Sequence, residues 1–204
     1  MRIAVIGAGS VGRHLATALA RAGHDVVVGV RDPDDPRHAD LARRATPADA
    51  VAGAEVVALA VPAAAVADAL AGLTLRPPAV VVDATNAVGA PPPGGFATMG
   101  ALTRSLVPDD VPVVKAFNTI GAEHLVAPVV DAMPAFLPVA GDRAGVDVVV
   151  PIARSLGFDA VDLGGPDAVP LVEDHARMWI HLMRNGWGRG FAFAVVGAPA
   201  GDDR

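Results

Sequence analysis

The chain contains no cysteine and carries more acidic than basic side chains. Without a single cysteine among its 204 residues, it has no disulfide, no thiolate catalysis and no cysteine-ligated metal. A formal net charge of −6 leaves no basic excess to attract nucleic acid or an anionic membrane surface. We therefore expect a small molecule as partner, with neither nucleic acid nor membrane, and the lack of disulfides fits a cytoplasmic location.

The sequence also lacks an apolar run that could cross a membrane. A spanning helix needs about 20 apolar residues with few charges. The most apolar window, residues 54–73, contains Glu55, Pro62 and Asp68, and we interpret it as a strand followed by a helix. No apolar leader precedes the first predicted strand, which begins at Arg2, so we expect no targeting segment.

Metal-ligand spacing is missing as well. None of the histidines forms an H-E-x-x-H arrangement. The six are His14, His24, His38, His124, His175 and His181. The last two belong to one predicted helix, but six positions separate them and they do not share a face. Ordinary helix histidines are the simpler interpretation, although either could protonate an acceptor near neutral pH. The sequence predicts no metal site.

What the chain does contain is an alternation of apolar strands and helices. The segment Ile3–Ile6 is apolar throughout, which is typical of a strand buried on both faces. Strands that alternate with helices predict an α/β fold, a Rossmann-type doubly wound and mainly parallel sheet. The predicted strands cover residues 2–6, 25–30, 55–61, 79–83, 111–116, 136–140 and 158–163, and the helices 11–22, 36–44, 63–70, 121–126, 146–156 and 168–184.

The strand and helix pattern weakens after Asn118 but continues. We predict a dinucleotide-binding domain over residues 1–120 and a small carboxy-terminal α/β extension over 121–196, packed on it and serving the acceptor site or dimerisation. Residues 197–204 are expected to be frayed. The helix over 168–184 and the tail behind it carry more apolar side chains than one chain of this size is expected to cover. A homodimer is therefore predicted.

The clearest motif is G-x-G-x-x-G over residues 7–12, between a predicted strand and a predicted helix. Gly7 permits the tight turn, and Gly9 lets a pyrophosphate approach the backbone. Gly12 lets the helix pack closely on the strand. The N–H groups and the dipole at the start of this helix attract phosphate charge. The motif in this context predicts a dinucleotide site.

The end of the second predicted strand indicates which dinucleotide binds. The position that usually carries a ribose-binding carboxylate holds Val30, and Arg31 follows it. An arginine suits a 2′-phosphate, which it can bind through two parallel hydrogen bonds, so we favour NADP(H) over NAD(H). Asp32 keeps the alternative open, because a shift of register would make it the ribose-binding acid. Arg37 and His38 could add positive charge.

Polar side chains also follow two later strands. Asn86 comes after the strand over 79–83, and Asn118 and Thr119 come after the strand over 111–116. Ligands of open α/β sheets bind at the carboxyl ends of the strands, where amides and hydroxyls can hydrogen-bond a carboxamide or ribose. Lys115 suits a structural ion pair as well as a functional role, and Asp83 suits a loop or cap position better than a catalytic base.

With these segments, the sequence resembles the NADP oxidoreductases that use the deazaflavin coenzyme F-420, and the related reductase domains of metalloreductases. The segments that carry the resemblance are Ile3–Gly12, Gly29–Arg31, Ala60–Pro62, Thr85–Asn86, Val114–Thr119, Ala140–Asp142, Leu156–Phe158 and Gly188–Phe193. The resemblance runs through most of the chain, and Val114–Thr119 is its most specific part.

The resemblance implies direct hydride transfer between nicotinamide and a stacked deazaflavin (F-420) or flavin (FMN or FAD) ring. It assigns phosphate binding to Gly9, Ser10, Val11 and Arg31, the ribose side to Val61 and Pro62, and the reacting, catalytic end to Asn86, Asn118 and Thr119. Two other functions stay open. One is a non-catalytic protein that binds or senses NADP(H), and the other is a reductase of imines or small carbonyls.

Overall fold

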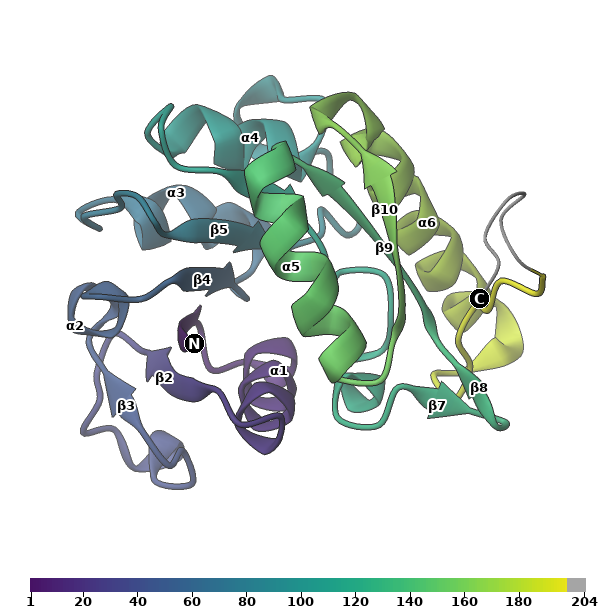
Figure 1. Cartoon of the computed structure of the whole chain (residues 1–204), viewed down its shortest axis with the longest axis horizontal. Helices are drawn as coiled ribbons and strands as arrows, with labels where there is room; N and C mark the ends of the chain where they lie inside the picture. Colours follow the sequence, from purple (N-terminus) through teal and green to yellow (C-terminus); the bar gives the residue numbers. More distant parts are fainter. Residues whose placement is uncertain (198–204) are drawn as a thin grey trace.

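The computed structural model describes residues 1–197, and the frayed end predicted for residues 197–204 lies outside this range except for its first residue. Its centre is one eight-stranded sheet (Figure 1). The strands are β1 (Arg2–Ile6), β2 (Asp25–Gly29), β3 (Arg44–Ala45), β4 (Val56–Leu59), β5 (Val80–Asp83), β6 (Val113–Lys115), β9 (Phe136–Gly141) and β10 (Asp159–Gly164). A separate two-stranded hairpin consists of β7 (Val129–Val130) and β8 (Met133–Pro134).

The strand order is β10-β9-β6-β5-β4-β1-β2-β3, and the pairs are parallel except where β9 meets β6. This confirms the predicted doubly wound, mainly parallel sheet. Lys115 of β6 lies opposite Ala140 of β9, and the two strands run in opposite directions. The start of β9 at Phe136 therefore extends past the carboxyl end of β6. Residues after Asn118 thus add strands to the Rossmann sheet and also reach the edge at which ligands bind.

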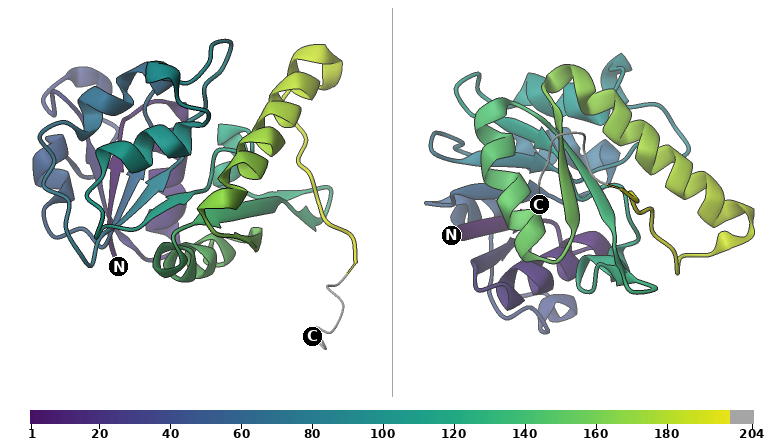
Figure 2. Two further views of the ribbon diagram at one scale, coloured as in Figure 1. Left: turned by 90° about the horizontal axis from the view of Figure 1, so that it is seen from above. Right: turned by 45° about the vertical axis from the view of Figure 1, so that its right-hand side comes forward.

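Helices cover both faces of the sheet (Figures 1 and 2). They are α1 (Ser10–Arg21), α2 (Pro47–Val51), α3 (Val66–Leu70), α4 (Met99–Leu106), α5 (Arg143–Ser155) and α6 (Val169–Leu182). Alternate strand residues point to opposite faces, so Val5 packs with α1 and α5, whereas Ile6 packs with α2, α3 and α4. The helix α6 lies against β9 beside α4, and a π-helical turn (Met183–Trp187) follows it.

The helix predicted over residues 36–44 is wrong in extent. Only a single 3₁₀ turn forms (Pro36–His38), capped by the side chain of Asp35, and Arg44 already belongs to β3. A polar segment without an apolar stripe gains little from a helix, whereas the open edge of β2 offers hydrogen bonds. The amide of Val28 donates to the carbonyl of Arg43 at 3.0 Å.

Two helices, α2 and α4, are not among the predicted elements. Each begins after a threonine whose hydroxyl accepts a backbone N–H bond, Thr46 from Asp49 and Thr98 from Ala101. Such N-caps are a sequence signal for a helix start, although both helices are short. No helix within residues 1–197 has the length and apolar character needed to span a bilayer.

Candidate functional site

The G-x-G-x-x-G turn lies at the carboxyl end of β1, as predicted. Each of its three glycines is suited to its position for a different physical reason. Gly7 adopts a φ of 108°, and a Cβ there would come within 2.6 Å of the carbonyl oxygen of Ala60. A Cβ on Gly12 would collide with the carbonyl oxygen of Gly7. A Cβ on Gly9, in contrast, would meet no protein atom within 4 Å. The protein's own packing requires Gly7 and Gly12, whereas Gly9 leaves free space for a ligand.

The start of α1 offers unpaired backbone donors beside this space. Gly9 is the N-cap of the 12-residue helix, and no side chain caps it. The first N–H groups of a helix, here those of Ser10 and Val11, have no partner inside the helix. No acidic side chain occupies the first turn. This end of α1 is thus suited to a phosphate group.

A cleft of about 850 Å³ runs from the glycine turn past the ends of β2 and β4. It is lined by five of the predicted cofactor-binding residues, namely Gly7, Gly9, Arg31, Val61 and Pro62. The predicted residues Ser10, Val11 and Gly12 belong to α1 directly after Gly9. Asn86, Asn118 and Thr119 lie further along the same edge of the sheet, after β5 and β6.

The cleft ends between charged side chains that follow β2. Arg31 and Asp32 are exposed and both line it, whereas Val30, at the usual ribose-acid position, is buried. Arg37 lies beside Asp35, with Nη2 and Oδ2 2.6 Å apart. Hydrogen bonds from Arg37 lower the pKa of Asp35 to about 2, so its carboxylate is ionised at neutral pH.

Arg13, which sequence reasoning missed, connects this loop to the glycine turn. Its Nε donates to the carbonyl oxygen of Ala8 at 2.9 Å, and its Nη2 donates to the carbonyl oxygen of Arg37 at 2.7 Å. Its guanidinium also pairs with Asp40 and lies 3.3 Å from Nδ1 of His38. Arg13 directly follows Gly12, but its partners in the loop after β2 are 24 to 27 residues away, and no local pattern points to them.

Further along the carboxyl edge of the sheet, Asn86 and Asn118 are joined by two hydrogen bonds. Nδ2 of Asn86 donates to the carbonyl oxygen of Asn118 at 2.6 Å, and Nδ2 of Asn118 donates to Oδ1 of Asn86 at 3.1 Å. Oδ1 of Asn118 and Oγ1 of Thr119 are buried without any partner among the described residues. Buried polar atoms without partners are rare and costly. Their place at the carboxyl ends of β5 and β6 suits a bound polar ligand.

The backbone before this pair is itself strained. Phe117 is buried and adopts a φ of 62°, which is unfavourable for a residue with a Cβ. Its ring packs edge-on against Phe158, the residue directly before β10, with centroids 6.2 Å apart. Strain of this kind persists where the surrounding packing enforces it, and it is concentrated at functional sites. Here it turns the chain after β6, immediately before Asn118.

A buried cluster of charged side chains lies next to the asparagine pair and contacts the backbone directly before Asn86. Nζ of Lys115 lies 3.2 Å from Oδ2 of Asp83 and 3.3 Å from Oε1 of Glu173, and it donates to the carbonyl oxygen of Thr85 at 2.6 Å. Glu173, which sequence reasoning missed, also accepts the N–H groups of Met99 and Gly100 at the start of α4. Of the two interpretations open for Lys115, the structure shows the ion pair.

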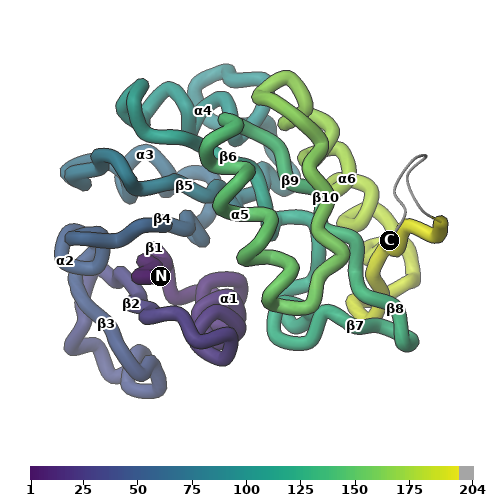
Figure 3. Tube along the Cα trace, in the orientation of Figure 1, coloured from purple at the N-terminus to yellow at the C-terminus, as the bar shows by residue number. Residues whose placement is uncertain are grey.

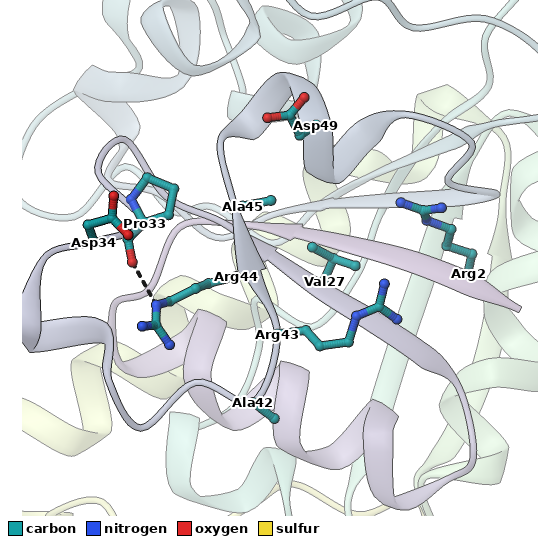
Figure 4. Close-up of a pocket in the computed structure, with 9 residues that line it drawn as sticks. All are labelled: Arg2, Val27, Pro33, Asp34, Ala42, Arg43, Arg44, Ala45 and Asp49. Atoms are coloured by element: carbon teal, nitrogen blue, oxygen red, sulfur yellow. Dashed lines mark hydrogen bonds between the residues drawn. The ribbon is translucent and has the colours of Figure 1, made fainter.

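A hollow of about 580 Å³ lies elsewhere, against β2 and the edge strand β3 (Figure 4). Three arginines line it, but two of them have partners within the protein. Nε of Arg44 donates to the carbonyl oxygen of Pro33 at 2.6 Å, and Arg43 pairs with Asp25. The hollow shares no residue with the cleft at the glycine turn. Within residues 1–197, no three histidine or acidic side chains group in a way that could hold a metal.

The Rossmann sheet, the open Gly9, the uncapped start of α1 and the cleft along the strand ends together define a dinucleotide-binding protein. Residues 2–87 match the family described as NADP oxidoreductase, coenzyme F-420-dependent. A crystal structure from Arthrobacter sp. FB24, provisionally described as an F-420-dependent NADP-reductase, is 30% identical and covers 97% of this chain and 100% of its own, with a TM-score of 0.77. The chain belongs to this family of NADP-dependent oxidoreductases.

Two further solved structures show the same fold. A hypothetical protein from Sinorhizobium meliloti is 30% identical and covers 81% of this chain and 85% of its own, with a TM-score of 0.70. An Aspergillus terreus reductive aminase in complex with NADPH and ethyl levulinate is 18% identical and covers 90% of this chain but 61% of its own, with a TM-score of 0.66. A search of curated proteins gave no match.

Proposed function

We propose that this protein transfers hydride between NADP(H) and a deazaflavin or flavin ring, with coenzyme F-420 the first choice of acceptor. The choice of acceptor is supported by the match to the coenzyme F-420-dependent family. The reacting end of the site is supported by the two unpartnered buried atoms, Oδ1 of Asn118 and Oγ1 of Thr119, at the carboxyl edge of the sheet. NADPH, when bound, supplies the hydride. The residues of the chain bind and orient the two reactants.

The adenosine half of the nucleotide is assigned to the long cleft. The backbone N–H groups of Ser10 and Val11 bind the pyrophosphate, which fills the space left open at Gly9. Arg31 binds the 2′-phosphate at the exposed end of the cleft. Val61 and Pro62, which follow β4, line the ribose side.

The reacting half is assigned to the asparagine pair. Asn118 presents its free Oδ1 to the N–H groups of the nicotinamide carboxamide, because its own Nδ2 is held by Asn86. Thr119 supplies a hydroxyl to the same group. Hydride transfer needs reacting atoms about 3–3.5 Å apart, so this orientation, rather than acid–base chemistry, is the contribution of these side chains.

The acceptor is tested by direct comparison. Steady-state rates with NADPH are measured for coenzyme F-420, FMN, FAD and a set of small imines. The proposal expects turnover of F-420 or a flavin. Turnover of imines alone would assign the protein to the second candidate function, imine reduction, which the fold shared with the reductive aminase favours. Tight NADPH binding without turnover of any acceptor would indicate a non-catalytic binding or sensing protein.

Asn118→Ala tests the assigned orientation. We expect a fall in the hydride transfer rate of about tenfold or more, because the carboxamide loses a buried hydrogen bond. The Kd for NADPH should change little, since most of the binding contacts lie in the long cleft. Single-turnover kinetics and calorimetry measure the two quantities separately. An unchanged rate would contradict the role of Asn118.

A further inference from the structure

A second cleft opens beside the asparagine pair, between the loop after β5 and α6. Its volume is about 450 Å³, and Asn86 is one of the residues that line it. Pro92, Phe96 and Ile180 give it apolar walls. A smaller hollow of about 270 Å³ shares four of its residues, among them Arg177 and Ile180, and extends it along α6. We call the two together the α6 groove.

The floor of the α6 groove is one face of the helix. Arg177 and His181 of α6, and Arg184 of the π-helical turn that follows it, are spaced by four and three positions, and all three line the smaller hollow. With a rise of 1.5 Å per residue, the two arginines are about 10 Å apart along the axis. All three side chains are exposed. The groove therefore joins an apolar part near Asn86 to a basic part near the end of α6.

The acidic groups near this groove cancel only part of its positive charge. Both carboxylate oxygens of Glu173 are occupied, by the N–H groups of Met99 and Gly100 and by Lys115. Asp174 pairs with Arg177 but does not line either hollow. Arg184 makes no ion pair with any residue of the described part of the chain. The outer end of the groove is therefore positively charged.

We infer that the α6 groove binds the acceptor through a phosphate-bearing tail, with the ring against Phe96 and Ile180 beside Asn86 and the phosphate at Arg184 and Arg177. This rests on the proposed function and deepens it. Charge-assisted bonds from arginine to phosphate are strong and directional. The groove thus selects a phosphorylated ring compound over the bare ring and over a small neutral imine.

Acceptors with and without the phosphate test this. FMN is compared with riboflavin, which differs from it only in the phosphate, and coenzyme F-420 with the deazaflavin alcohol, which lacks both the phosphate and the charged chain attached to it, each with saturating NADPH. We expect kcat/KM to be at least about tenfold higher for the phosphorylated member of the pair. The preference should shrink as salt is raised, because exposed charges are screened. The two pairs also show which ring system carries the phosphate that the groove prefers.

Arg184→Gln, and Arg177→Gln separately, should reduce the phosphate preference to about threefold or less, while rates with the bare ring stay within about twofold. Arg21→Gln is the matched control, since it removes the same charge from an exposed site at the end of α1. It should leave the preference unchanged. NADPH affinity, measured by calorimetry, should stay the same in all three variants and shows that they are folded.

The outcomes separate this inference from the proposed function. Equal turnover of both members of a pair, unaffected by either arginine change, would overturn the α6 groove as a phosphate site while the hydride transfer stands. Loss of NADPH affinity in Arg184→Gln would also overturn it, because the arginine would then serve the cofactor. If NADPH binds but no ring acceptor is reduced, the proposed function is wrong, and the inference about the α6 groove, which rests on it, is wrong as well.

Discussion

In the loop after β2, the acidic residue Asp35 lines the same cleft as Arg31, which is assigned to the 2′-phosphate, and Arg37. Arg37 is exposed and lies over Asp35, with its Nε 3.1 Å and 3.0 Å from the two carboxylate oxygens. Because the pKa of Asp35 is about 2, this carboxylate is charged throughout the neutral range and neutralises Arg37. A phosphate that arrives next to Arg31 must compete with Asp35 for the second guanidinium.

Asp35→Asn should therefore tighten the binding of NADPH. The amide still accepts the N–H of Arg37 that caps the 3₁₀ turn, but the negative charge is gone. We expect the Kd for NADPH to fall by about threefold or more and the Kd for NADH to stay constant, measured by calorimetry at low salt. Equal changes for both nucleotides would show that Asp35 acts on the loop rather than on the phosphate.

Arg31→Ala should act in the opposite direction. One charge-assisted hydrogen bond contributes roughly 1.5–3 kcal/mol, so the preference for NADPH over NADH should fall by about tenfold or more. The same calorimetric titrations measure this. If the unmodified protein binds NADPH and NADH equally, Arg31 does not bind the 2′-phosphate, and the competing interpretation through Asp32 gains support.

At the scale of elements, a single buried cluster joins two strands and two helices. Lys115 of β6 contacts Asp83 of β5 and Glu173 of α6, and Glu173 also caps α4. Oδ2 of Asp83 accepts a further bond from Thr103 of α4 at 2.9 Å. These charges stabilise the fold only while all partners are present, because each is expensive to bury alone. The cluster also holds the carbonyl of Thr85, directly before Asn86.

Lys115→Met should lower the free energy of unfolding by about 3–5 kcal/mol, because two carboxylates remain buried without their cation. Urea denaturation measures the loss. Adding Glu173→Gln removes one of these charges, so the double variant should be more stable than Lys115→Met alone. A loss below about 1 kcal/mol in the single variant would show that the cluster contributes little to stability.

The packing of α6 against the carboxy-terminal tail, which contains Phe193, makes a second contribution to stability, and this one depends on pH. The ring of His175 lies between Phe136 and Phe193, at centroid distances of 5.4 Å and 4.7 Å, and its Nε2 is buried without a partner among the described residues. Burial lowers the pKa of His175, since the imidazolium form loses its hydration. The pKa of His24 is lowered by burial as well.

Stability should consequently fall in mild acid. The folded pKa lies below the ordinary value of 6.5, so below about pH 6.5 the unfolded chain binds more protons than the folded one. The melting temperature should be constant above pH 7 and should decrease towards pH 5. In His175→Phe, which keeps an aromatic ring and loses no hydrogen bond, this decrease should be smaller. An identical pH profile in thermal melts would exclude a contribution from His175.

At the scale of the whole molecule, the tail covers only part of the apolar surface of α6. Trp179 is 4% exposed, since the ring of Phe191 stacks on it at 5.2 Å and its Nε1 donates to the carbonyl oxygen of Phe191. Leu171 and Met178 on α6 nevertheless stay 59% and 50% exposed, and Trp187 after it stays 65% exposed. Apolar surface of this kind, on one projecting helix (Figure 2), favours association.

We therefore expect a homodimer that buries the outer side of α6. Light scattering at low concentration should give twice the mass of one chain. Leu171→Lys combined with Met178→Lys should convert it to a monomer, because each lysine would bury a charge at the interface. Leu106→Lys changes an exposed leucine on α4 instead and should leave the dimer intact. A monomer in the unmodified protein would contradict this assembly.

The sequence alone determined what depends on local geometry. The dinucleotide turn could be predicted because the positive φ of Gly7 and the close contact between Gly12 and Gly7 arise within the six-residue motif. The strands and helices could be predicted because the spacing of apolar side chains reports which face is buried. The trace of the Cα chain follows that alternation from β1 to α6 (Figure 3). Asn86, Asn118 and Thr119 could be placed at one edge because parallel strands all end on the same side.

The tertiary structure decided which segments cover one another. Spacing shows that a side chain is buried but not what buries it, so the antiparallel pairing of β9 with β6 was not visible beforehand. The sequence alone indicates no special role for Glu173 on its helix. In the structure Glu173 forms an ion pair with Lys115, which lies 58 positions earlier in the chain. The helix predicted over 36–44 gave way to β3 for the same reason, since the open edge of β2 offered backbone hydrogen bonds that no local pattern records.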